Sequence, residues 1–96
     1  MDQNTLSEVK KILFKYLDQT QYRAFIFGSR ADNSAQKFSD IDIGIEGNQQ
    51  LPAEAYFDIL DAFENSDIPY LVDVVDFSQV SDKFKQVAKA NIQNLN

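Results

Sequence analysis

The chain has 96 residues, a net charge of −6 and no cysteine or histidine, and its length predicts one folded domain, residues 1–96. The two missing residue types exclude thiolate catalysis, Ser-His triads and Cys/His zinc sites, which leaves carboxylates and hard cations such as Mg²⁺ for acid–base or metal chemistry. The acidic balance disfavours long nucleic acids as substrates, and the lack of a membrane-length apolar run, a signal-peptide core and cysteine predicts a cytoplasmic protein.

The first predicted element is a helix from Thr5 to about Asp18. Thr5 and Glu8 have the spacing of a capping box, which places the start of the helix at Thr5. Apolar residues then recur at helical spacing: Leu6, Val9, Leu13, Tyr16 and Leu17. The aromatic and β-branched run over residues 22–27, stopped by Gly28, predicts a buried strand.

A polar loop over residues 29–38 leads into a second predicted strand, residues 39–45, in which carboxylates alternate with isoleucines. Because successive side chains of a strand point to opposite faces, Asp40 and Asp42 share one face. The other face can be buried and carries Ile41, Ile43 and Ile45. An acidic pair on a core-anchored strand, next to a Gly-Ser turn, indicates a site for metal and phosphate.

A helix, a strand and a final helix complete the chain. The second helix begins near Pro52, and its apolar stripe consists of Tyr56, Ile59, Leu60 and Phe63. Residues 71–77 form a third strand that is apolar except for two aspartates. Ser81 caps the last helix, whose apolar side runs on to Leu95. The order α-β-β-α-β-α predicts an α+β, α/β sandwich-like fold with three strands, helices packed on one face and the other face open for a site.

Asp73 interrupts the apolar third strand, and a carboxylate there must be solvated, paired or metal-bound. If the third strand lies beside the second, Asp73 joins Asp40 and Asp42, and their repulsion raises at least one pKa unless a cation lies among them. Each feature alone has a plain structural explanation: an exposed strand edge for the aspartate pair, a lysine partner for Asp73, an ordinary turn for Gly28-Ser29. The ordered combination is much rarer by chance.

This order of motifs resembles the minimal nucleotidyltransferase (MNT) group of the DNA polymerase beta superfamily, over nearly the whole chain. The group's pattern is a strand ending in Gly-Ser, a short loop, a Ser-Asp-x-Asp strand and a third aspartate on a later strand. The matching residues are Gly28-Ser29, Ser39-Asp40-Ile41-Asp42 and Asp73. The resemblance implies a polymerase beta-like nucleotidyltransferase fold with a mixed sheet. One departure is Asp32-Asn33, where many members have a basic residue and a glycine.

The resemblance also implies roles for these residues. Asp40, Asp42 and Asp73 would be catalytic and would hold Mg²⁺, as two ions, with Asp73 taking the proton of the acceptor hydroxyl. The residues that the resemblance assigns to the nucleotide, with ATP as substrate, are Gly28, Ser29, Arg30 and Ser39.

The MNT resemblance implies an enzyme that transfers a nucleoside monophosphate, AMP from ATP, to a hydroxyl. Members of this size look like antitoxins whose partner is a HEPN-domain ribonuclease toxin encoded nearby, and some adenylylate a tyrosine of that toxin. The alternative is a non-catalytic binding module that neutralises its partner by complex formation. A sugar-nucleotide transferase is disfavoured because 96 residues leave little room for two substrate-binding subdomains.

Overall fold

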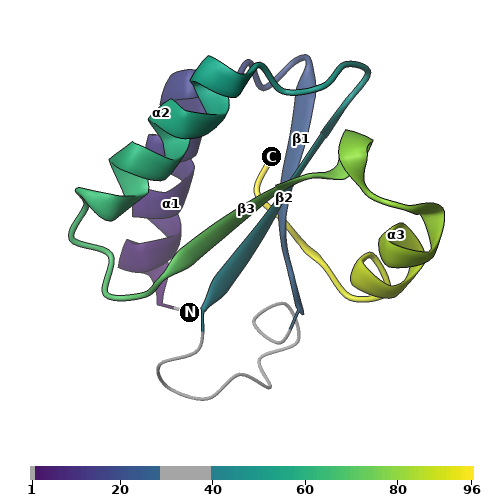
Figure 1. Ribbon diagram of the computed structural model, residues 1–96. Coiled ribbons are helices and arrows are strands. Elements are labelled where there is room, and N and C mark those ends of the chain that lie inside the picture. Colours follow the sequence, from purple (N-terminus) through teal and green to yellow (C-terminus); the bar gives the residue numbers. More distant parts are fainter. Residues whose placement is uncertain (1, 29–39) are drawn as a thin grey trace.

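The computed structural model describes residues 2–28 and 40–96, which form a sheet with helices on both of its faces (Figure 1). In chain order the elements are α1 (Gln3–Tyr16), β1 (Tyr22–Phe27), β2 (Ile41–Gly47), α2 (Ala53–Glu64), β3 (Val72–Asp76), the 3-10 helix η2 (Phe77–Gln79), α3 (Asp82–Ala88) and β4 (Gln93–Asn94). This order agrees with the predicted one except for the strand after the last helix. Within the described ranges, no helix is long and apolar enough to cross a membrane.

The sheet has the strand order β3-β2-β1-β4. β1 and β2 pair antiparallel, whereas β2 and β3 run parallel because α2 carries the chain back between them. The sheet is therefore mixed, as the resemblance implied.

The C-terminal residues form a fourth strand where the sequence predicted helix. α3 ends at Ala88, and Gln93–Asn94 pairs antiparallel with the middle of β1. Leu95 is buried in the core, and its backbone N–H donates to the carbonyl oxygen of Ala24 at 2.9 Å. A buried apolar residue at position 95 fits a helical stripe and an extended segment equally well, so periodicity did not separate the two. The predicted number of three strands was therefore wrong, because this short edge strand is a fourth.

One face of the sheet packs against α1 and α2 and forms the main core (Figure 1). The alternation predicted for the second strand is confirmed, because its isoleucines all point into this core. The sheet contributes Ala24, Ile26, Ile41, Ile43, Ile45 and Val74, and the two helices contribute Val9, Leu13, Ile59 and Phe63.

Helix α1 begins earlier than predicted. Asp2 is its N-cap, and Oδ1 of Asp2 accepts a hydrogen bond from the backbone N–H of Thr5 at 2.7 Å. Thr5 lies within the first turn and is buried. Because aspartate caps a helix at least as well as threonine, the sequence was compatible with both starts. The prediction of a capping box at Thr5 and Glu8 was wrong.

The opposite face of the sheet carries an aromatic cluster and α3 (Figure 1). The rings of Phe25 and Phe77 meet edge to face with centroids 4.9 Å apart, and Phe27 lies 5.3 Å from Phe77. Ala88 of α3 packs against this cluster. Phe25 and Phe27 make β1 apolar on both faces, and both faces therefore need cover. The prediction that the helices pack on one face only was wrong for this reason.

Gly44 lies under the aromatic cluster, where a side chain has no room. A Cβ at this position would lie 2.4 Å from Cε2 of Phe25 and 2.7 Å from Cε1 of Phe77. We expect Gly44→Ala to lower the free energy of unfolding by about 1–3 kcal/mol, measured by urea denaturation, because two buried rings must shift. The double variant with Phe25→Leu should lose less free energy of unfolding than the two single variants lose together, because the smaller side chain makes room for the added methyl group. A strictly additive double variant would contradict the contact.

Candidate active site

The three aspartates of the predicted site lie at the same end of the sheet. In the parallel pairing of β2 with β3, Asp42 and Asp73 are register partners. On its other side, Asp42 is paired with Phe27, the last residue of β1. Asp40 lies one residue before β2 and is exposed, as is Asp73, whereas Asp42 is partly buried. The predicted adjacency of the second and third strands is confirmed, and it places Asp73 beside the acidic pair.

Gly28 continues the chain from β1 directly beside Asp42. Its φ of +74° lies in the left-handed region, which glycine enters without steric penalty. A Cβ at this position would lie 2.9 Å from Oδ2 of Asp42. Both the backbone conformation and the neighbouring carboxylate therefore require glycine here. The expected contact of Gly28 with a triphosphate stays a prediction.

The pKa of Asp42 is raised above its ordinary value, first by burial and then by the negative charges of Asp73 and Asp40. Burial and like-charge repulsion both disfavour the ionised carboxylate, and a bound cation reverses both effects. A carboxylate perturbed in this way by a specific cluster of charges is typical of functional sites.

The donor set of this cluster suits magnesium. Carboxylates offer only hard oxygen ligands, which Mg²⁺ prefers. Asp42 is held by a strand on each side, while the exposed Asp40 and Asp73 keep the side-chain freedom to turn toward a shared ion. Across residues 2–28 and 40–96, no three acidic side chains are already grouped to hold a metal ion. Metal binding would therefore draw the carboxylates together from the positions that the strands give them.

Of the residues predicted to bind the nucleotide, Gly28 is found where it was expected, at the end of β1. The other three, Ser29, Arg30 and Ser39, lie outside the described residues. The same is true of Asp32-Asn33. Their roles stay predictions.

Asp76, on the same strand as Asp73, has a structural role instead. Its carboxylate accepts hydrogen bonds from the backbone N–H of Leu51 at 2.8 Å and of Ser78 at 2.9 Å. The hydroxyl of Ser78 donates to it as well, at 2.7 Å. Asp76 therefore ties the chain before α2 to the start of η2, and it is not a candidate metal ligand.

A recess of about 300 Å³ opens beside Gly28 and was missed by the sequence analysis. It is lined by the end of β1, one side of α3 and the chain just after that helix: Phe27, Gly28, Phe84, Val87, Ala88 and Asn91. Phe84 and Val87 are 40% and 73% exposed, although they belong to the apolar side of the predicted last helix. The available signal was Asn91, a polar residue that continues this helical spacing.

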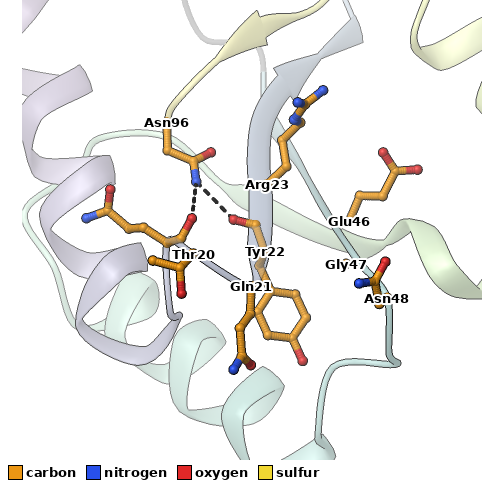
Figure 2. A pocket seen from close by; sticks show the side chains of 9 residues that line it. Thr20, Gln21, Tyr22, Arg23, Glu46, Gly47, Asn48 and Asn96 are labelled. Atoms are coloured by element: carbon orange, nitrogen blue, oxygen red, sulfur yellow. Dashed lines mark hydrogen bonds between the residues drawn. The ribbon is translucent and has the colours of Figure 1, made fainter.

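A larger hollow of about 640 Å³ lies at the opposite end of β1 and β2 (Figure 2). Its lining is mostly polar: Gln19, Thr20, Gln21, Tyr22, Arg23, Glu46, Gly47, Asn48 and Asn96. The side chain of Asn96 donates to the carbonyl oxygens of Gln19 and Tyr22, which fixes one wall. Glu46 is the only acidic side chain among these lining residues, and it forms an ion pair with Lys89. The described part of the hollow's lining therefore lacks the paired carboxylates that metal chemistry needs.

Known sequences that resemble this chain point to one family. The family described as "Polymerase beta, Nucleotidyltransferase" matches residues 5–94, a range that contains Gly28 and the three aspartates. A curated relative, the "Probable protein adenylyltransferase MntA" of Haemophilus influenzae, is 33% identical over 84 residues. The match covers 88% of this chain and 72% of the relative.

Solved structures share the fold at lower sequence identity. A crystal structure of a toxin–antitoxin with AMP-PNP superposes with a TM-score of 0.77 at 22% identity, covering 95% of this chain and 72% of that chain. A complex of an MNT antitoxin with the tri-AMPylated HEPN toxin of Shewanella oneidensis gives 0.74, also at 22% identity, covering 100% of this chain and 72% of that chain. At these identities the likeness shows the fold.

Replacing Asp42 by asparagine removes the charge that burial and repulsion disfavour. Because its folded-state pKa is raised, ionised Asp42 destabilises the metal-free fold, and this penalty develops as the pH rises from the ordinary value of 3.8 through the raised one. We therefore expect Asp42→Asn to have a higher Tm than the wild type at neutral pH in EDTA. The difference should shrink once the pH falls below the ordinary value, where Asp42 is protonated in both states.

Thermal denaturation across this pH range checks the prediction, and Mg²⁺ should raise the Tm of the wild type but not of Asp42→Asn. Asp58→Asn is the matched control, because Asp58 is an exposed carboxylate on α2. A variant no more stable than the wild type at neutral pH would show that Asp42 carries no such penalty.

Proposed function

The chain belongs to the polymerase beta nucleotidyltransferase family, and we propose that it transfers AMP from ATP to a hydroxyl, with Asp40, Asp42 and Asp73 as its catalytic residues. The observation that carries the proposal is the strand register, which sets Asp42 between Asp73 on β3 and Phe27 at the end of β1, with Gly28 directly beside its carboxylate. With no histidine or cysteine in the chain, carboxylates are the available groups for this chemistry.

The three carboxylates divide the reaction between them. Asp40 and Asp42 would hold two Mg²⁺ ions, and Asp73 would complete the site. Bound Mg²⁺ supplies positive charge that offsets the negative charge of the phosphates and carboxylates. Asp73 accepts the proton of the acceptor hydroxyl, whose oxygen bonds to the α-phosphorus of ATP. The bond from the α-phosphorus to its bridging oxygen breaks, and pyrophosphate leaves with that electron pair. We assign the triphosphate to Gly28 together with Ser29, Arg30 and Ser39.

We place the acceptor hydroxyl on a tyrosine of a HEPN-domain toxin encoded nearby, so that the chain acts as its antitoxin in the cytoplasm. The Haemophilus relative is named as a protein adenylyltransferase, and the Shewanella structure pairs an AMPylated HEPN toxin with an MNT antitoxin. The net charge of −6 supports a protein acceptor over a long nucleic acid. Asp73 is exposed on the edge strand β3, which gives a bulky acceptor access to it.

Labelled ATP, Mg²⁺ and the neighbouring HEPN-domain protein test this reaction directly. We expect the wild type to label the partner and Asp73→Asn to do so about 10²–10⁴-fold more slowly, because the proton acceptor is lost. Asp58→Asn should retain the wild-type rate, since Asp58 lies on α2, which covers the other face of the sheet. If nucleotide and Mg²⁺ bind but no label reaches the partner, the acceptor is not this protein.

A binding module that neutralises its partner without chemistry is the second candidate. It is favoured by Leu71, a large apolar side chain that is 74% exposed two residues before Asp73. Asp40→Asn combined with Asp42→Asn separates the two functions, because it removes the metal-binding carboxylates and leaves this apolar surface intact. We expect the double variant to form the complex but to lose neutralisation of the toxin. Unchanged neutralisation would establish the binding module instead.

A further inference from the structure

An apolar recess begins where the acidic site ends, because Gly28 borders both. The backbone of Gly28 stands close enough to Asp42 that a Cβ would lie 2.9 Å from Oδ2, and the same residue lines the recess. Phe27, also in the lining, is the strand partner of Asp42. A ligand whose phosphates are held at the carboxylates therefore has the recess within reach of its other end.

The side of the recess opposite Phe27 comes from the last helix and the residues just after it. Phe84, Val87 and Ala88 share one side of α3, because Val87 and Ala88 follow Phe84 by three and four residues. Asn91 lines the recess from the chain just after the helix. The ring of Phe84 meets that of Phe27 edge to face, with centroids 6.1 Å apart. Phe84 and Val87 nevertheless remain 40% and 73% exposed. This combination of a positioned aromatic ring with uncovered apolar surface favours a flat apolar ligand.

We propose that this recess binds the base of the nucleotide and that Asn91 hydrogen-bonds to the edge of the base. The inference rests on the proposed function, since it adds the base site to the phosphate site. Aromatic side chains bind bases through their flat faces, and a volume of about 300 Å³ accommodates a purine. A carboxamide carries a donor and an acceptor side by side, which complements the amino group and ring nitrogen of adenine. Among the described residues that line the recess, Asn91 is the only one with a hydrogen-bonding side chain.

Two probes separate the base from the phosphates: a non-hydrolysable ATP analogue, and inorganic triphosphate, which has no base. Calorimetric titration in Mg²⁺ should show that Val87→Glu weakens binding of the ATP analogue by about 10-fold, because a charge in the recess opposes burial of the base. Binding of inorganic triphosphate should not change. Val87 is 73% exposed, so the substitution is compatible with folding. Gln86→Glu is the matched control, since it adds the same charge to α3 outside the recess.

Asn91→Asp tests the hydrogen bond to the base independently. A carboxylate only accepts, so it suits the two neighbouring donors of guanine better than the edge of adenine. We expect the ratio of affinities for the ATP and GTP analogues to fall by about 10-fold in this variant.

Four results would overturn the base site. Val87→Glu could weaken binding of inorganic triphosphate as much as binding of the ATP analogue. It could also leave nucleotide binding unchanged while blocking the complex with the HEPN-domain protein, which would make the recess a protein contact. The wild type could also bind the two probes equally, which would remove the base site and leave the proposed function standing. A wild type that binds neither probe would overturn both.

Discussion

The register between β2 and β3 is the constraint on which the whole site depends. The backbone N–H of Ile41 donates to the carbonyl oxygen of Leu71 at 2.9 Å, and the ladder that follows sets Asp42 beside Asp73. A slip of one residue would turn Asp73 into the core and expose Val74. Because α1 and α2 bury Val74 and the isoleucines of β2, burial of this apolar face fixes the register and therefore the positions of the aspartates on the opposite face.

The second core, on the acidic side of the sheet, determines how much of that face remains open. The rings of Phe25, Phe27 and Phe77 cover its middle, and α3 packs against them. The cluster ends at Phe27, so the chain reaches Gly28 just where Asp42 begins to meet solvent. The aromatic contacts thereby anchor the end of β1 next to a carboxylate whose charge the fold disfavours. The acidic cluster lowers the stability of the fold, and the two hydrophobic cores around it provide the stability that offsets this loss.

Most of the sheet and the position of the acidic residues could be predicted, because alternation along a strand is a local property of the sequence. Asp42 follows from that alternation alone, and Asp73 required one further assumption, that the third strand lies beside the second. β4 could not be predicted, since its pairing is non-local and Leu95 fits a helical stripe equally well. The recess was hidden for a similar reason. Phe84 and Val87 have the spacing of core residues, and only the packing of α3 shows that they are left partly uncovered.

The positions of the recess and of Asp73 on opposite sides of Asp42 determine how the two substrates would approach. With the base beside β1, the nucleotide extends across β2, and its α-phosphate is reached from the β3 side. β3 is an edge strand, so no further strand in the described part of the chain covers that approach. Asp73 faces solvent there, and the exposed Leu71 lies just before it. A small acceptor would need no such opening, whereas a tyrosine carried by a folded partner would, and the exposed leucine would give that partner an apolar contact next to the proposed proton acceptor.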